Sequence, residues 1–151
     1  MPITYMIDIP RRMIFITATG EIDLATYREY LEVRDADPLY DRTMFAIFDA
    51  REAQFEYSQE DMRWCVGFTK NSLPDTRTKR AIVVSTSHEY GLSRMFQTLS
   101  LDSKLEYSVF RDYDAAMGWL LSDSLRRDAD TVKHDVSQSR SRQGSNAPHG
   151  A

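Results

Sequence analysis

The sequence predicts an α/β domain whose helices pack on a mixed sheet of about five strands. Along the chain, apolar residues alternate between the period of two that is typical of strands and the period of 3.6 that is typical of helices. Two segments, residues 44–48 and 81–84, are apolar throughout, as strands covered on both faces are. The resulting order is strand, strand, helix, strand, helix, strand, helix, strand, helix, which predicts a single-domain mixed sheet.

The chain begins with a predicted hairpin followed by a helix. Residues 5–9 and 13–18 have strand patterns, and the short link of residues 10–12 suits a turn between them. A helix is then expected from about Leu24 to Arg34, with Asp23 as its N-cap.

Two strand and helix pairs follow this first helix. After the strand of residues 44–48, Ser58 and Asp61 have the spacing of a capping box, which predicts a helix whose inward face is Met62, Cys65, Val66 and Thr69. Pro74 lies in the linker after it. The strand of residues 81–84 precedes a helix with a predicted inward stripe of Leu92, Met95, Phe96 and Leu99.

A last strand and helix complete the predicted domain, which spans residues 1–125. The strand covers residues 106–110, and Asp112 caps a helix whose predicted buried face is Ala116, Trp119 and Leu120. From residue 126 to residue 151 the chain has no Leu, Ile, Met, Phe, Tyr or Trp, so it cannot bury enough apolar surface to offset its ordering entropy. We therefore predict a disordered tail over residues 126–151.

Charge and composition argue against several classes of function. Residues 1–125 hold 14 Lys and Arg against 20 Asp and Glu, so this acidic domain is not expected to bind nucleic acid. The only local basic group in it is Arg77, Lys79 and Arg80. One cysteine and three scattered histidines exclude an intramolecular disulfide and a cysteine-rich zinc site. We expect no metal site and no cofactor. With no leader-like start and no apolar run near 18 residues, we expect a cytoplasmic protein that is not transmembrane.

The motifs of common enzyme classes are missing, so we predict a protein that is not an enzyme and has no catalytic residues. The sequence has no Gly-x-Ser-x-Gly, His-Glu-x-x-His or Gly-x-Gly-x-x-Gly motif and no phosphate-binding loop. Cys65 is expected to face inward as an inert thiol. The enzyme alternative is a small hydrolase that uses His88 with Asp49 or Ser87.

Polar residues at the predicted ends of the parallel strands are candidates for binding an anionic ligand, because free backbone N–H groups gather at that edge of such a sheet. They are Asp49, Arg51, Thr86, Ser87, His88 and Arg111. The alternative is that they are helix caps and solvated side chains. Trp64 falls just outside the inward stripe of its helix and is a candidate for an exposed contact with a protein partner.

Aromatic and methionine side chains on the predicted helix faces raise a second binding hypothesis. Seven methionines are a generous number for 151 residues, and a deformable apolar pocket between helices and sheet could form from them. The alternative is ordinary core packing. The side chains concerned are Tyr27, Tyr30, Met62, Phe68, Met95, Phe96 and Trp119.

Several of these segments together resemble the SpoIIAA-like branch of the STAS fold over about residues 3–121. They are the opening hairpin, the strand that ends in Phe48-Asp49, the helix that begins near Ser58, and the closing segment of residues 109–120 with Phe110-Arg111-Asp112 and Trp119-Leu120. The resemblance implies a protein-interaction module or a binder of small apolar molecules.

In the anti-sigma-factor antagonists of that fold, a serine at the start of the second helix is phosphorylated, and the matching position here is Ser58. Glu56, Glu60 and Asp61 surround it and oppose a phosphate, so we predict that Ser58 is a cap and not a phosphorylation switch.

The sequence therefore favours a non-enzymatic, cytoplasmic STAS-like module for regulatory protein–protein interaction. A binder of a small apolar or anionic ligand in a lipid-like pocket is the alternative, and a homodimer stays open.

Overall fold

The computed structural model describes residues 1–72, 77–99 and 105–122. The chain divides into two compact units, Met1–Leu120 and Leu121–Ala151, and only residues 121 and 122 of the second unit are described. The predicted tail of residues 126–151 and the linker at Pro74 lie outside the described residues. The fold below is that of the first unit.

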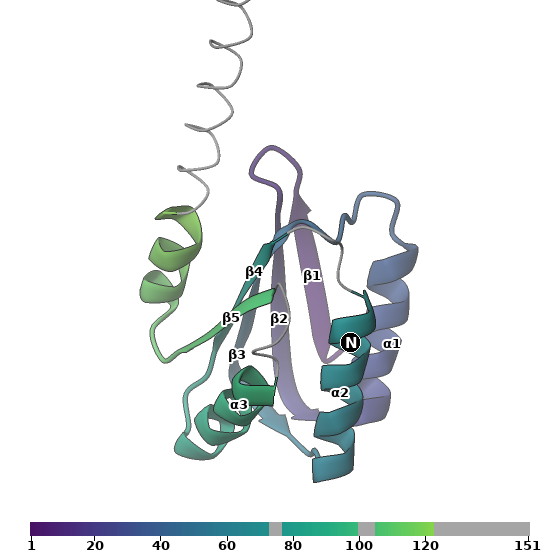
Figure 1. Ribbon diagram of the computed structural model, residues 1–151, viewed down its shortest axis with the longest axis vertical. Helices are drawn as coiled ribbons and strands as arrows, with labels where there is room; N and C mark the ends of the chain where they lie inside the picture. Colours follow the sequence, from purple (N-terminus) through teal and green to yellow (C-terminus); the bar gives the residue numbers. More distant parts are fainter. Residues whose placement is uncertain (73–76, 100–104, 123–151) are drawn as a thin grey trace, which may run out of the picture. The chain divides into compact units, whose positions relative to one another are not determined.

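The first unit contains a five-stranded mixed sheet whose strands lie side by side in chain order (Figure 1). They are β1 (Ile3–Asp8), β2 (Met13–Ile22), β3 (Phe45–Phe55), β4 (Thr78–Val83) and β5 (Leu105–Phe110). β1 and β2 form the predicted antiparallel hairpin, and β2 to β5 are parallel. The predicted fold class is confirmed.

β3 is longer than the sequence indicates. The apolar segment predicts a strand only over residues 44–48, yet β3 continues to Phe55, so Asp49 and Arg51 lie within the strand and not in a loop after it. The reason is pairing with a distant segment: past an irregularity between Thr17 and Thr19, residues 52–55 of β3 pair with residues 19–22 of β2. The polar sequence of residues 49–54 does not indicate a strand, because the segment with which it pairs is remote in sequence.

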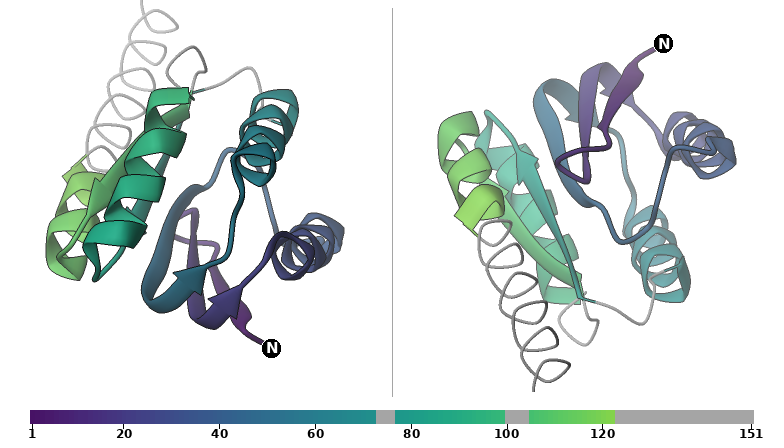
Figure 2. Two further views of the ribbon diagram at one scale, coloured as in Figure 1. Left: turned by 90° about the horizontal axis from the view of Figure 1, so that it is seen from below. Right: turned by 90° about the horizontal axis from the view of Figure 1, so that it is seen from above.

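Three helices, α1 (Leu24–Ala36), α2 (Gln59–Ser72) and α3 (Ser87–Leu99), cover one face of the sheet (Figures 1 and 2). Residues 113–122 form a last helix. Its Trp119 contacts Lys79 of β4 and Phe110 of β5. Since side chains alternate along a strand, Lys79 faces away from its neighbour Arg80, which lies with the three helices. The last helix therefore lies on the opposite face.

Three predicted helix caps are confirmed. The Asp23 carboxylate accepts a hydrogen bond from the Thr26 backbone N–H at 2.8 Å, and Asp112 accepts one from Ala115 at 3.0 Å. At α2 the Ser58 hydroxyl accepts from the Asp61 N–H at 3.1 Å. In return, the Ser58 N–H donates to the Asp61 carboxylate at 3.0 Å. Each bond satisfies a backbone group that would otherwise lack a helical partner.

The buried helix faces agree with the sequence prediction except in α3 and at one residue of the last helix. All four predicted inward residues of α2 are buried. In α3, however, Met95 is 40% exposed, and the buried residues are Glu89 and Ser93. The Leu99 side chain lies outside the described part. In the last helix, Ala116 and Leu120 are fully buried, whereas Trp119 is only half-buried.

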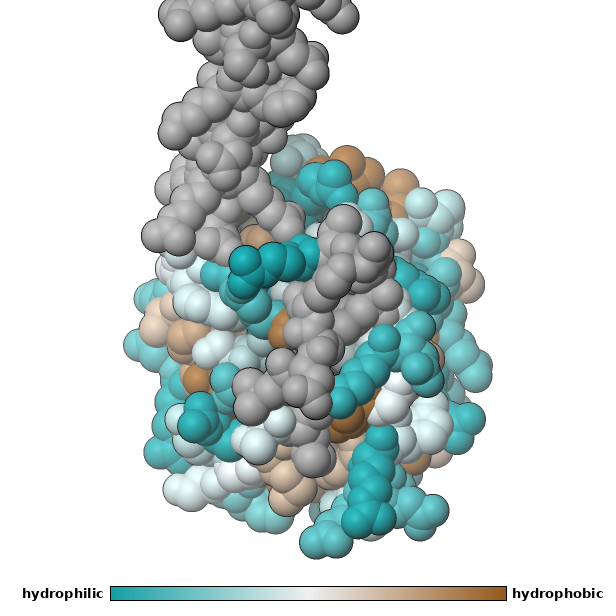
Figure 3. Space-filling model, viewed as in Figure 1, coloured by the Kyte–Doolittle hydropathy of each residue, from teal (hydrophilic) through white to brown (hydrophobic). Residues whose placement is uncertain are grey.

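Hydrophilic residues predominate on the face of the molecule shown in Figure 3, where apolar residues form separate small areas. Single exposed apolar side chains are ordinary on a protein surface. The most exposed large apolar residues of the described part are Met1, Met6, Ile9, Val33, Leu39 and Met95.

Candidate functional site

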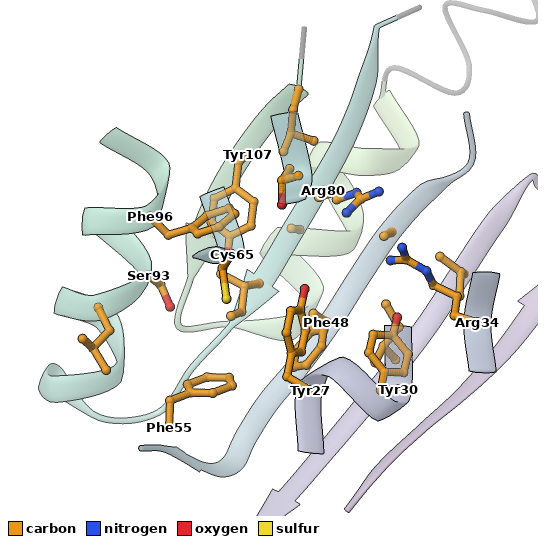
Figure 4. A pocket seen from close by; sticks show the side chains of 18 of the residues that line it. Tyr27, Tyr30, Arg34, Phe48, Phe55, Cys65, Arg80, Ser93, Phe96 and Tyr107 are labelled. Carbon is orange, nitrogen blue, oxygen red and sulfur yellow. The ribbon is translucent and has the colours of Figure 1, made fainter. Parts of the chain in front are cut away.

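A cavity of about 100 Å³ lies between the three helices and the sheet, and it is partly open to solvent (Figure 4). Every strand except β1 contributes to its wall, as do all three helices that cover this face. The lining residues are Ile14, Ile16, Tyr27, Tyr30, Arg34, Tyr40, Ala46, Phe48, Phe55, Tyr57, Met62, Cys65, Thr69, Arg80, Ala81, Ile82, Leu92, Ser93, Phe96, Leu105 and Tyr107.

Secondary-structure periodicity brings these side chains together. On α1, Tyr27, Tyr30 and Arg34 are spaced three and four residues apart, which places them on one helix face. On β4, Arg80 and Ile82 are two residues apart and so share a face of the sheet. The wall is thus fixed by rigid elements and not by loops alone.

Most of the wall is aromatic or aliphatic. Phe48 at the floor lies 6.3 Å between ring centroids from both Tyr30 and Phe55. Phe96 and Tyr107, which also line the cavity, contact each other with their ring centroids 4.8 Å apart. Such a lining favours an apolar occupant.

Three buried polar atoms of the described residues have no hydrogen-bond partner, and all three belong to residues that line this cavity. They are the Tyr30 Oη, the Tyr57 Oη and the Arg80 Nε. The Arg34 guanidinium lies near the Tyr30 ring, at 5.7 Å from its centroid, without forming a normal hydrogen bond to the hydroxyl. Buried polar groups are nearly always hydrogen-bonded. Three unpaired polar atoms in one cavity therefore make it a candidate ligand-binding site.

The two arginines of the cavity have different surroundings. Arg34 is buried, and its Nε and Nη2 both donate to the Asp35 Oδ1, at 3.1 and 2.9 Å. Its guanidinium also lies over the Tyr40 ring, 4.6 Å from the centroid. Arg80 has one polar contact among the described residues, a 3.5 Å contact from Nη2 to the Tyr40 hydroxyl. The cavity therefore contains one neutralised and one unneutralised cation.

Burial holds Tyr30, Tyr107 and Cys65 of the cavity wall in their protonated forms. Burial raises the pKa of Tyr30 and Tyr107 above the ordinary tyrosine value, although the positive charge of Arg80 opposes this rise. Burial, followed by the negative charge of Asp61, raises the pKa of the Cys65 thiol to about 12. The hydroxyls therefore act as hydrogen-bond donors at neutral pH, and the thiol is not a nucleophile.

None of the candidates for a strand-end site, the phosphorylation position or a partner contact lines the cavity. These eight residues are Asp49, Arg51, Ser58, Trp64, Thr86, Ser87, His88 and Arg111. Asp49 and Arg51 pair with each other, through N···O distances of 2.9 and 2.8 Å, and these hydrogen bonds hold the pKa of Asp49 below its usual value. Arg51 also lies over the Tyr113 ring of the last helix, 5.2 Å from its centroid. This pair thus belongs to the opposite face of the sheet.

The other strand-end candidates come partly together. Arg111 donates to the Ser87 hydroxyl at 3.1 Å and lies over the Tyr90 ring. The Thr86 hydroxyl accepts from the Glu89 N–H at 3.2 Å, as a helix cap does. His88 is exposed in the first turn of α3. Whether this group binds an anion stays a prediction.

Trp64 is half-buried and not exposed as expected. Its ring stacks on Phe68 with centroids 5.2 Å apart, and the Arg28 guanidinium of α1 lies 4.8 Å from its centroid. The Trp64 side chain thus forms a contact between α1 and α2. Its contact with a protein partner stays a prediction.

Ser58 is expected to contribute to stability through its capping bond. Replacing Ser58 with alanine removes the acceptor for the Asp61 N–H and should lower the free energy of unfolding by about 1 kcal/mol. Urea denaturation measures the change, with Ser58→Thr, which retains a capping hydroxyl, as the control. A loss well above 2 kcal/mol in the alanine variant would show that the hydroxyl does more than cap α2.

The sequence predicts part of the apolar wall of this cavity but not its charged end. Of the aromatic and methionine residues proposed for an apolar pocket, Tyr27, Tyr30, Met62 and Phe96 line it, whereas Phe68, Met95 and Trp119 do not. The missed signal is the alternation along β4. Once this strand is taken to begin at Thr78, Arg80 falls on the same face as the buried Ile82.

Within residues 1–72, 77–99 and 105–122, no cluster of three or more His, Cys, Asp or Glu side chains is placed to hold a metal ion. In that same part of the chain, no helix has both the length and the apolar character needed to cross a membrane.

No protein-family model and no curated protein matches the chain. Among solved structures, it is similar to an uncharacterised protein of the DUF3478 family with a SpoIIAA-like fold from Shewanella loihica PV-4, whose crystal structure has a resolution of 2.25 Å. The two share 15% sequence identity with a TM-score of 0.54, over 78% of this chain and 93% of that one. The chain therefore has a SpoIIAA-like fold, as the sequence resemblance predicts.

Proposed function

We propose that this SpoIIAA-like domain is a non-enzymatic binding module that holds one small, mainly apolar molecule in the cavity between its helices and sheet. The observation that carries the proposal is the coincidence of an apolar cavity with three unpartnered polar atoms in its wall. An unsatisfied buried polar group costs about 1 to 3 kcal/mol. A ligand that pairs with such groups recovers that cost on binding.

The size of the cavity limits the ligand to one small molecule. An engineered apolar cavity of about 150 Å³ admits benzene, and the cavity here, at about 100 Å³, is of the same order. A single ring or a short branched chain matches this volume, whereas the long chains of a membrane lipid do not. Met62 in the wall has a flexible side chain that can adapt to the shape of the ligand.

A binding role is favoured over catalysis because the cavity lacks an activated nucleophile. Cys65 is protonated at neutral pH, and His88, the base of the enzyme alternative, is exposed and does not line the cavity. Regulatory contact with a protein partner, the role that the sequence favours, stays a prediction.

Thermal denaturation with toluene and with phenol, two neutral single-ring compounds, tests the proposal. A ligand that binds only the folded state raises the melting temperature in proportion to the logarithm of its concentration. We expect such a rise for at least one of the two compounds. In Ala46→Leu the longer side chain fills the cavity from β3, and we expect no rise there.

The matched control is Ala25→Leu, the same change at an exposed position of α1, which should behave as the native chain does. If neither compound raises the melting temperature of the native chain at millimolar concentration, or if Ala46→Leu responds equally, the proposed cavity binding is wrong.

A further inference from the structure

The charge of Arg80 lacks a counterion among the described residues. Its Nε is buried without a partner, and its one polar contact is the 3.5 Å approach of Nη2 to the neutral Tyr40 hydroxyl. By contrast, the carboxylate of Glu106 on β5 pairs with Arg77 and Lys79, whose side chains lie on the opposite face of the sheet from Arg80. Of the three basic residues of this segment, Arg80 lines the cavity, and no carboxylate of the described residues pairs with it there.

Arg34 lies at the same end of the cavity, because both arginines contact Tyr40. Figure 4 shows the two guanidinium groups together at that end, away from the rings of Phe55 and Phe96. Only one carboxylate, that of Asp35, pairs with them in the described residues. This end of the cavity therefore carries one net positive charge beside an apolar chamber.

A partly buried cation without a counterion is unfavourable. An anion that enters the cavity and pairs with Arg80 removes this cost. The planar guanidinium fork matches a carboxylate, which it binds through two parallel hydrogen bonds. The Tyr30 hydroxyl, which is protonated and has no hydrogen bond of normal geometry, is a further donor in the same wall.

We propose that the ligand is a small monocarboxylic acid whose carboxylate pairs with Arg80 and whose ring or branched chain lies among Phe48, Ile82 and Phe96. This inference rests on the small-molecule binding proposed above and gives that ligand its charge. One unneutralised guanidinium matches one negative charge, whereas a phosphate dianion needs a second free cation. Arg34 does not supply it, because Asp35 already neutralises Arg34.

Calorimetric titration with benzoate and with benzamide tests the inference. The two probes have nearly the same shape, and only benzoate carries a charge. We expect the native chain to bind benzoate at least about tenfold more tightly, as charge-assisted hydrogen bonds require. Arg80→Met, which keeps an unbranched apolar stem and removes the guanidinium with its charge, should bind the two probes with affinities within about threefold of each other.

Two further variants keep the test decisive. Arg77→Met removes one positive charge from the exposed side of the same segment and should retain the preference for benzoate. Arg80→Lys keeps the charge without the planar fork and should retain only part of it, which provides a second readout if Arg80→Met does not fold.

The outcomes separate the two proposals. If benzamide binds as tightly as benzoate, or if Arg80→Met keeps the preference, the carboxylate inference is wrong and the cavity binds neutral molecules. If neither probe binds and toluene and phenol also fail, the proposed function itself is wrong. Binding of inorganic phosphate in place of benzoate would also contradict the inference.

Discussion

Replacing Leu120 with alanine is expected to lower the free energy of unfolding by about 3 kcal/mol. Leu120 is fully buried on the last helix, and a truncated core leucine loses its transfer free energy and leaves a cavity. Equilibrium denaturation in urea measures the difference. The result tests whether the last helix is an integral layer of the domain.

Gly118→Ala in the same helix is the matched control. Gly118 is exposed, and a Cβ added there meets nothing within 4 Å. Alanine should therefore raise the free energy of unfolding by about 0.5 to 1 kcal/mol through helix propensity alone. Equal, small effects of both variants would mean that the last helix does not pack on the sheet.

Replacing Tyr30 with phenylalanine is expected to raise the free energy of unfolding by about 1 kcal/mol. Tyr30 is 4% exposed and its hydroxyl has no hydrogen bond of normal geometry, so its removal eliminates a poorly satisfied buried group and keeps the aromatic packing. A site that serves a ligand commonly lowers stability in this way. Urea denaturation of the ligand-free protein measures the gain.

Tyr5→Phe makes the same chemical change nearby with the opposite expected sign. The Tyr5 ring lies 6.1 Å from that of Tyr30, but its hydroxyl donates to the Asp37 carboxylate at 2.7 Å. Losing this bond should lower the free energy of unfolding by about 1 kcal/mol. If Tyr30→Phe also destabilises the protein, its hydroxyl has a partner in solution and the reasoning about unpartnered groups fails.

Local patterns predict the parts of the fold that local forces determine. The cap at Asp23 and the box of Ser58 with Asp61 depend on residues three apart, so the sequence alone locates them. The length of β3 depends instead on residues 19–22 of β2, which no local pattern connects to residues 52–55. The exposure of Met95 depends on the rotation of α3 about its own axis relative to the sheet. The apolar stripe of the helix does not determine that rotation.

The candidate site was harder to predict than the fold for a related reason. Strand-end polar residues attract attention in an α/β sequence, yet here Asp49 and Arg51 neutralise each other on the other face of the sheet. The cavity is instead formed by core-like aromatic residues together with Arg34 and Arg80. Such charges are recognised as cavity residues only when the face of each element is known.

Methyl-resolved NMR of the full chain with toluene shows directly whether the cavity binds a small apolar molecule. Met62, Ile82 and Leu92 are three of the methyl-bearing residues that line the cavity, and the exposed Met6 and Ile9 serve as internal controls. We expect saturable shifts of these three lining residues, with ring-proton contacts from toluene, and unchanged signals from the controls. Unshifted lining methyls at saturating toluene, or shifts confined to Met6 and Ile9, would contradict the proposed cavity binding.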